Sequence, residues 1–206
     1  MKEMKVRITF LEPVLGTRPA DPELHSHFIA SKAPDHKTMA EEIADFGTQE
    51  VEERGKTIFM KLEDGTPYLY TYMLSGYFKE TARALKKVPG SKTSKVTAYL
   101  KKIDNNIFIR GHIPGKPRVM PLYMPIDLDL TATDNQRPLR ASTPQGERVA
   151  LAHSEEAPAG SYFECTIYCE IDADVKLVEE WLDRGQGKGI GQWRSAGYGL
   201  FTWERI

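Results

Sequence analysis

The order of predicted elements favours an α+β fold, with a ferredoxin-like or RRM-like antiparallel sheet, helices on one of its faces, and two insertions. Three observations predict it. Runs typical of strands stand at both ends of the chain and in its middle. Two stretches, 71–87 and 172–184, have the apolar spacing of amphipathic helices. Two long segments, about 17–66 and 114–158, interrupt these elements and are too long for simple loops.

The first half of the chain begins with a half-buried strand over 4–12, where apolar residues alternate with polar ones and several are β-branched. Within the first insertion we expect a helical patch near 38–46 and a strand over 58–62. The helix over 71–87 ends at Pro89 and Gly90. Its expected buried face consists of Leu74, Tyr77, Phe78, Thr81 and Leu85.

The second half contains the clearest strand pattern of the chain, over 161–171. Strands are also predicted over 97–100, 106–113 and 120–125, and at the end of the chain over 200–206. Much of 114–158 is rich in Pro, Thr, Arg and Asn, so we expect irregular structure there. The helix over 172–184 is expected to bury its apolar side chains, which are Val175, Leu177, Val178, Trp181 and Leu182.

Charge is distributed unevenly along a chain whose total is nearly neutral. The 206 residues carry a formal net charge of −1 and are expected to form a single domain, 1–206, with its two insertions. Between Lys79 and Lys102, eight Lys and Arg residues stand against one acid, Glu80. Between Asp21 and Asp64, eleven acids stand against five bases. This asymmetry predicts a basic face and a separate acidic region.

The two cysteines, Cys165 and Cys169, fall four residues apart on one face of a predicted strand. This separation is too great for easy disulfide formation, and no histidines accompany them as zinc ligands. We therefore expect two buried thiols in a reducing compartment. No signal peptide or apolar run of membrane-spanning length is found, so a cytoplasmic protein is expected.

A glycine-rich stretch, 185–199, connects the last predicted helix to the last strand. Its six glycines allow close approach of another chain, Lys188 and Arg194 add positive charge, and Trp193 and Tyr198 offer flat rings. Exposed amide groups, cations and rings together suit a phosphodiester chain. The helix-loop-strand order excludes a dinucleotide fingerprint, which needs strand-loop-helix order. A flexible connector between helix and edge strand is the alternative.

Four segments, in order along the chain, resemble the RAMP superfamily, especially the backbone subunits of type III CRISPR effector complexes. They are the opening strand with its exit, 6–16; the helix start, 65–69 and 73–83; the insertion and strand entry, 135–155 and 158–163; and the glycine-rich loop, 189–199. Tyr70 to Tyr72 replace the serines of the family's helix-start motif, and Gln192 and Trp193 replace small residues of its loop. The chain is short for a backbone subunit, so a distant free-standing relative, of the kind that phage genomes carry, is expected.

The resemblance implies binding of single-stranded nucleic acid, RNA or DNA. The implied phosphate contacts are Lys79, Arg83, Lys188 and Arg194, extended by Arg137, Arg140 and Arg148, and the implied stacking rings are Tyr72, Trp193 and Tyr198, with Gly189 and Gly191 in the loop. Three structural alternatives stand beside these roles. In the first, the basic helix residues only form a solvated face. In the second, Trp193 anchors the loop in the core, and in the third the three arginines pair with acids such as Asp134 and Glu147.

Evidence for catalysis is weak. His25, His27 and His36 lie among acids in the first insertion, but the spacing of four metal ligands is absent. In related proteins a histidine acts in metal-independent RNA cleavage, or an aspartate follows the first strand; Asp21 and Asp35 occupy that region without the surrounding motif. We therefore expect no catalytic residues, no metal and no cofactor.

Three hypotheses follow from these observations. The first is a non-catalytic single-strand binding protein that assembles head to tail along the strand, and the basic run from Lys79 to Lys102 favours it. The second is a protein-binding decoy or inhibitor of a CRISPR-type complex, which the acidic insertion favours. The third is a metal-independent endoribonuclease.

Overall fold

The chain divides into two units, each assembled from separate stretches of sequence. A computed structural model describes residues 1–20, 56–143 and 146–206, with the backbone alone over 139–143 and 146–150. Unit 1 consists of residues 1–14, 60–127 and 157–206, and unit 2 of residues 15–59 and 128–156. The short strands β2 (Val14–Leu15) and β11 (Glu156–Ala157) stand where the chain passes from one unit to the other.

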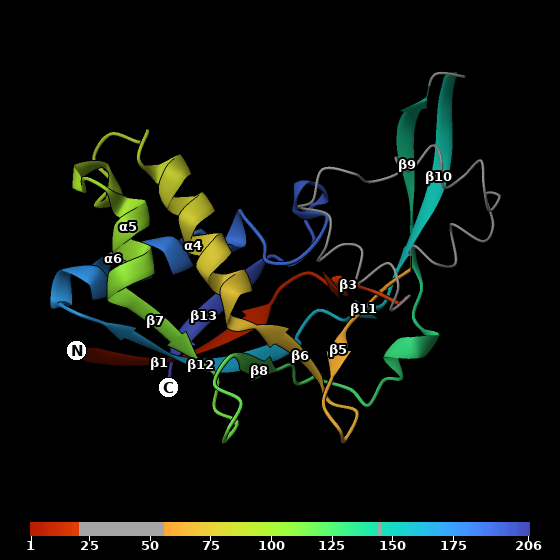
Figure 1. Ribbon diagram of the computed structural model, residues 1–206, viewed down its shortest axis with the longest axis horizontal. Coiled ribbons are helices and arrows are strands. Elements are labelled where there is room, and N and C mark those ends of the chain that lie inside the picture. The colour runs from red at the N-terminus through yellow and green to blue at the C-terminus, as the bar shows by residue number, and fades with distance from the viewer. Residues whose placement is uncertain (21–55, 144–145) are drawn as a thin grey trace, which may run out of the picture. The chain divides into compact units, whose positions relative to one another are not determined.

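A four-stranded antiparallel sheet forms the base of unit 1. Its strand order is β13-β1-β12-β7, with bounds Phe201–Arg205, Lys2–Phe10, Tyr162–Cys169 and Ile107–Arg110. Helices α4 (Thr71–Leu85), α5 (Tyr99–Asn106) and α6 (Asp172–Leu182) lie on one side of this sheet (Figure 1). The predicted α+β class is confirmed. The ferredoxin-like assignment stays a prediction, with which this strand order is compatible.

Alternate residues of the central strands build the core of unit 1. Val6, Ile8 and Phe10 of β1 are buried, because a period of two sends every second side chain to the helix-covered face. The ring of Phe78 on α4 lies 5.5 Å from that of Trp181 on α6. Both predicted helices are confirmed. Each residue of the expected apolar face of α4 is buried, whereas Val175 of α6 is only half-buried.

Helix α4 begins next to a small three-stranded sheet, β5-β6-β8, whose strands are Met60–Lys61, Pro67–Tyr70 and Val119–Pro121. The N-cap residue, Tyr70, makes no side-chain hydrogen bond to the helix start. Instead, the backbone N–H of Thr71 donates to the carbonyl of Arg118 at 3.0 Å, which satisfies one of the free amides of the first turn. The small sheet thus fixes the position at which α4 starts.

The predicted strand over 97–100 is wrong, because this stretch leads into helix α5. Ala98 adopts a left-handed conformation, with φ of 52°, and its carbonyl accepts from the N–H of Lys102. Lys102 then places its ammonium 2.5 Å from the carboxylate of Asp174, which is fully buried on α6. This ion pair compensates a charge that would otherwise be costly to bury, so tertiary contact overrides the weak local preference for a strand.

Unit 2 contains a long hairpin where irregular structure was expected. β9 (Asn135–Thr143) pairs antiparallel with β10 (Gly146–Ser154), so that expectation is wrong for 135–154 of the second insertion. β10 also pairs with β4 (Thr57–Ile58), which pairs with β3 (Arg18–Pro19). The single strand predicted over 58–62 is found as two short strands, β4 and β5.

Several smaller expectations have different outcomes. The strand predicted over 120–125 is β8, which is shorter, and the helical patch near 38–46 lies outside the described residues. Short 3₁₀ helices cover Thr93–Lys95, Leu130–Ala132, Asp183–Gln186 and Arg194–Ala196.

The cysteines are free and buried, as predicted, and burial raises the pKa of Cys165 to about 12. Over the described ranges, every helix is too short or too polar to span a lipid bilayer.

Candidate nucleic-acid interface

One exposed face of α4 combines an aromatic ring, an open glycine and two cations. Tyr72, Gly76, Lys79 and Arg83 follow one another at spacings of four, three and four residues, so they lie along one side of the helix. Tyr72 is 65 % exposed and Arg83 is exposed, whereas the ammonium of Lys79 lies 2.5 Å from the carboxylate of Asp104 on α5. The helix therefore presents a ring at its start and positive charge two to three turns further on.

Gly76 has no packing reason to be a glycine. A Cβ built on it would meet no atom of the described residues within 4 Å, and its φ lies outside the left-handed region. Glycine inside a helix nevertheless costs about 0.5–1 kcal/mol relative to alanine. The bare backbone leaves the surface between Tyr72 and Lys79 open to close approach.

Replacing Gly76 with Ala is expected to raise the free energy of unfolding by about 0.5–1 kcal/mol, measured by urea denaturation. Gly65→Ala is the matched control, because its added Cβ also meets nothing within 4 Å, but its φ of +84° strains any side-chain-bearing residue. The control should lower stability. A destabilised Gly76→Ala would show that Gly76 is needed for the fold itself.

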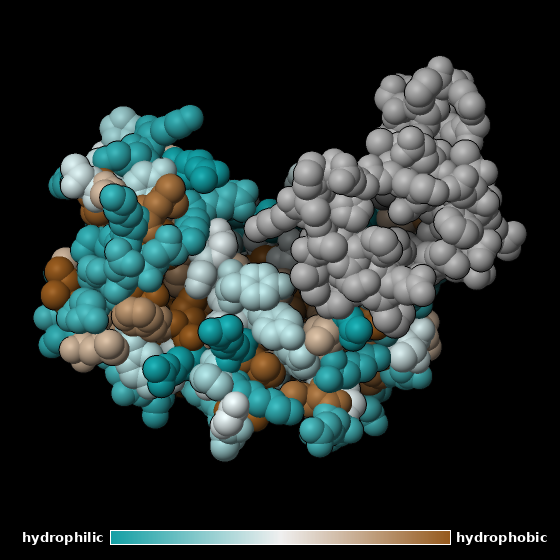
Figure 2. Space-filling view, viewed as in Figure 1, coloured by the Kyte–Doolittle hydropathy of each residue, from teal (hydrophilic) through white to brown (hydrophobic). Residues whose placement is uncertain are grey.

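A row of three tyrosines leads into the start of α4. Tyr68 and Tyr70 occupy the outward positions of β6, where polar side chains are usual, while Pro67 and Leu69 are buried. The ring of Tyr70 lies edge-on to that of Tyr68 at 5.2 Å and is stacked on that of Tyr72 at 5.4 Å. A pale band of intermediate hydropathy covers this region in Figure 2.

The hydroxyls of Tyr68 and Tyr70 lie 3.2 Å apart, within hydrogen-bonding distance, which holds these two rings in place. Partial desolvation and the neighbouring Tyr70 raise the pKa of Tyr72, so its hydroxyl is neutral at physiological pH. The row is a preformed stacking surface.

The glycine-rich loop is tightly built. The N–H of Ile190 donates to the carbonyl of Gly199, and the N–H of Gly199 donates to the carbonyl of Pro13. A Cβ on Gly189 would lie 2.2 Å from the carbonyl oxygen of Tyr198, and one on Gly199 would lie 1.9 Å from that of Ile190. These two glycines therefore allow the two sides of the loop to touch. The alternative of a flexible connector does not fit these contacts.

A single carboxylate holds this loop against α4. The carboxylate of Glu80 lies 2.8 Å from the ammonium of Lys188, with which it forms an ion pair. It also accepts a hydrogen bond from the guanidinium of Arg194. Burial alone would raise the pKa of Glu80, but the hydrogen bonds and charges of the two cations outweigh it and lower the pKa below its usual value. Two of the predicted phosphate-contacting residues thus meet at one anion, which belongs to the protein itself.

A depression of about 640 Å³ lies around this carboxylate, lined by Glu80, Gly187, Lys188, Gly191, Gln192, Trp193, Arg194 and Ser195. Trp193 adopts a left-handed backbone, with φ of 51°, and its ring stacks on that of Tyr198 at 5.1 Å and 18°. Because Trp193 is 37 % exposed, the alternative of a core anchor is wrong. The structure therefore brings the predicted cations and rings of the loop together beside α4.

The basic run between Lys79 and Lys102 is not a continuous positive face. Lys86 donates to the carbonyls of Ser94 and Val96, and Lys102 pairs with Asp174. Together with the pairing of Lys79 and Asp104, these interactions mean that part of the positive charge is already paired within the protein. Arg83 makes no ion pair or side-chain hydrogen bond with any described residue, so its charge is available to a ligand.

The three insertion arginines belong to unit 2. Arg137 is buried and donates to the hydroxyl of Ser154 at 3.1 Å, while Asp134 pairs with His153. Arg140 and Arg148 lie where only the backbone is described. Their proposed contacts with nucleic acid stay predictions.

The histidines and aspartates considered for catalysis, between Asp21 and His36, lie outside the described residues. Within the described ranges, no three His, Cys, Asp or Glu side chains are placed to hold a metal ion together.

Sequence reasoning missed four residues of this surface: Tyr68, Tyr70, Gly76 and Glu80. The alternation of Tyr68 and Tyr70 with buried neighbours was a usable signal, as was the unexplained glycine within a helix. The pairing of Glu80 with Lys188 and Arg194 joins residues more than 100 positions apart, so no local pattern could have indicated it.

No protein-family model matches the chain, and no curated protein matches it in sequence. Among solved structures, the chain is similar to a chain from the cryo-EM structure of the type III-B Cmr-beta complex bound to cognate target RNA, with a TM-score of 0.52 and 14 % identity. The similarity covers the whole of this chain and 61 % of that one. At this identity the likeness shows a shared fold, that of a subunit of a CRISPR-type complex.

Proposed function

We propose that this protein binds single-stranded nucleic acid, without catalysis, along the exposed face of α4 and the adjoining glycine-rich loop. The observation that carries the proposal is the joining of a tyrosine row, which runs from β6 into the start of α4, to the available cation of Arg83 on the exposed face of α4. Rings that stack on bases and cations that meet phosphates are the usual elements of sequence-tolerant single-strand binding. The RNA bound by the Cmr-beta complex supports RNA as one ligand, and DNA remains the other.

A single strand suits this surface better than a duplex. In a duplex the bases are stacked on each other, and their faces are closed to Tyr72 and Trp193. In a single strand each base offers a face to such rings. The bare backbone at Gly76 gives the sugar-phosphate chain room to pass between Tyr72 and Lys79.

We further propose that the chain is a single RAMP-like domain, 1–206, with insertions about 17–66 and 114–158, and that copies assemble head to tail along the strand. CRISPR-type protein subunits are its proposed protein partners, and a free-standing, phage-encoded origin is the proposed setting. The Cmr-beta likeness supports the CRISPR-type partners through its fold, whereas head-to-tail assembly and the phage-encoded origin stay predictions.

A protein-binding decoy of a CRISPR-type complex is the second candidate. The pairing of Lys79, Lys188 and Arg194 with acids favours it, because cations already neutralised attract a polyanion less strongly. This candidate predicts poor affinity for any oligonucleotide and a stable complex with a protein subunit.

Replacing Arg83 with Ala tests the proposed path along α4. If Arg83 meets one phosphate of a single strand, the slope of log K against log salt concentration should become less steep by about 0.7 in the variant. The slope is measured by fluorescence anisotropy of a labelled oligonucleotide between low and moderate salt.

Lys95→Ala is the control for Arg83→Ala, because Lys95 is an exposed cation of the same unit that belongs to the 3₁₀ helix Thr93–Lys95 and not to α4. It should leave the slope nearly unchanged. Equal changes in both variants would indicate that the overall charge of the unit, and not the α4 path, determines binding.

A further inference from the structure

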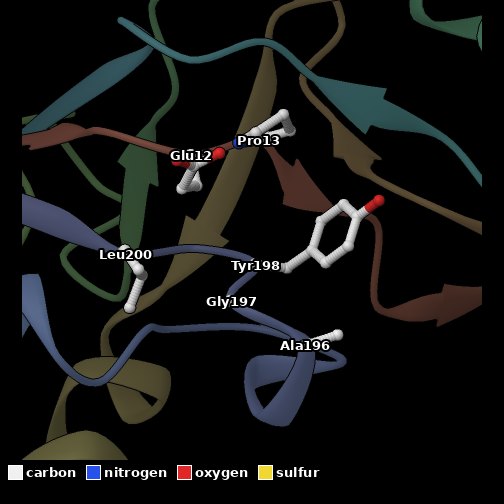
Figure 3. A pocket seen from close by; sticks show the side chains of 6 residues that line it. All are labelled: Glu12, Pro13, Ala196, Gly197, Tyr198 and Leu200. Carbon is white, nitrogen blue, oxygen red and sulfur yellow. The ribbon is translucent and has the colours of Figure 1, made fainter.

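A second pocket, of about 430 Å³, lies between the exit of β1 and the end of the glycine-rich loop. It is lined by Glu12, Pro13, Ala196, Gly197, Tyr198 and Leu200. Figure 3 shows Glu12 and Leu200 on one side of it and the ring of Tyr198 on the other. All six residues belong to unit 1, and hydrogen bonds hold the walls together: Leu11 donates to the carbonyl of Leu200, and Gly199 to that of Pro13.

The apolar walls of this pocket suit a flat ring. Tyr198 lines the pocket, and its ring, which is stacked on Trp193, gives the pocket an aromatic wall. Pro13 and Leu200 supply further apolar surface. The volume falls within the usual range for small-ligand pockets, which is roughly 300–1,000 Å³.

Among the described residues that line the pocket, the charged group is the carboxylate of Glu12. It makes no ion pair or side-chain hydrogen bond with any described residue, so its oxygens are available to a ligand. A carboxylate repels phosphate and only accepts hydrogen bonds. The parts of a nucleic acid that suit this carboxylate are therefore its donors, a base edge with N–H groups or a ribose hydroxyl, and the apolar walls favour the base.

We propose that this pocket binds a guanine base, with its ring against Tyr198 and its Watson–Crick edge on Glu12; the inference rests on the proposed single-strand binding. Guanine carries two adjacent donors on that edge, N1–H and the N2 amino group, which match the two oxygens of one carboxylate. Adenine and cytosine offer one amino donor beside an acceptor that would face the carboxylate. Uracil offers a single N3–H between two carbonyls, and these carbonyls would oppose the carboxylate.

The test compares three labelled single strands: a 15-mer of uridines, the same strand with one central guanosine, and the same strand with inosine there. Inosine keeps N1–H and lacks the N2 amino group. Wild type is expected to bind the guanosine strand at least about fivefold more tightly than either of the others, as one bidentate base contact does. Glu12→Gln should abolish this preference, since its amide presents a donor to a donor edge.

Glu3→Gln is the matched control, because Glu3 is an exposed carboxylate of β1 and its removal changes the net charge equally. It should keep the preference. Equal binding of all three strands by wild type, or a preference that survives Glu12→Gln, overturns the guanine pocket and leaves single-strand binding standing. Failure to bind any strand overturns both.

Discussion

Replacing Glu80 with Gln is expected to tighten binding of a single-stranded oligonucleotide by roughly fivefold for each cation released, and up to about 25-fold if both Lys188 and Arg194 are released. The two cations share the Glu80 carboxylate in the free protein. A phosphate must displace this carboxylate before it reaches them. Each cation freed to meet a phosphate makes the plot of log K against log salt concentration steeper by about 0.7. Between about 1 M and 0.1 M salt, one decade of concentration, log K of the variant therefore rises by about 0.7 more than that of wild type.

The effect should also depend on pH. Because the pKa of Glu80 is lowered in the folded protein, the carboxylate stays charged at neutral pH, and its ion pairs weaken only as the pH falls through that lowered value. Wild-type binding near neutrality should therefore show no step from this group. At every pH near neutrality, Glu80→Gln should bind the strand more tightly than wild type does.

Glu179→Gln serves as the control for Glu80→Gln. Glu179 forms a comparable ion pair with Arg205, at 2.7 Å, on α6 and β13. This substitution removes the same charge from the same unit and should change affinity little. Weaker binding by Glu80→Gln than by wild type would contradict the account, since it would mean that Glu80 is needed to position the loop for its ligand.

Replacing Tyr72 with Ala is expected to weaken single-strand binding by roughly 5- to 150-fold, which corresponds to the about 1–3 kcal/mol that one base-stacking ring contributes. Tyr72 is the most exposed ring of the tyrosine row and stands at its junction with the cations of α4. Because stacking does not release counterions, the salt slope should remain that of wild type. Anisotropy titrations at several salt concentrations separate the two effects.

Two variants make the Tyr72 test specific. Tyr72→Phe keeps the ring and should keep most of the affinity. Tyr123→Ala removes another exposed tyrosine of unit 1, one whose ring lies against Tyr162 instead of the row, and should have little effect. Equal decreases in affinity in Tyr72→Ala and Tyr123→Ala would mean that the tyrosine row is not the binding surface.

Much of the fold could be predicted because the strong patterns are local. β1, β12, α4 and α6 each show a clear period of two or of 3.6 residues, and all were expected within a few residues of their observed bounds. The sequence did not predict helix α5 because this helix is only eight residues long and buries only Ile103, which gives no helical pattern. The β9–β10 hairpin was missed because β9 is largely polar and the apolar residues of β10 stand in one run without alternation, so the pairing of the two strands defines them.

In the candidate site, too, local features could be predicted and long-range contacts could not. The sequence indicated which residue types gather on α4 and in the glycine-rich loop, and the structure brings Lys188, Trp193 and Arg194 together there. It could not indicate that Glu80 joins helix and loop, because that pairing is long-range. Gly189 was expected to let a ligand approach. The structure instead buries it, and the absence of a side chain leaves room for the carbonyl oxygen of Tyr198.

The central claim is that this protein binds single-stranded nucleic acid through the α4 face and the loop. Its most direct test is fluorescence anisotropy of a labelled ~30-mer, as RNA and as DNA, titrated with wild-type protein across a salt series. We expect saturable binding that weakens steadily with salt, and the two affinities show whether RNA or DNA is preferred. Absence of binding to both strands at low salt would contradict single-strand binding and favour the protein-binding alternative.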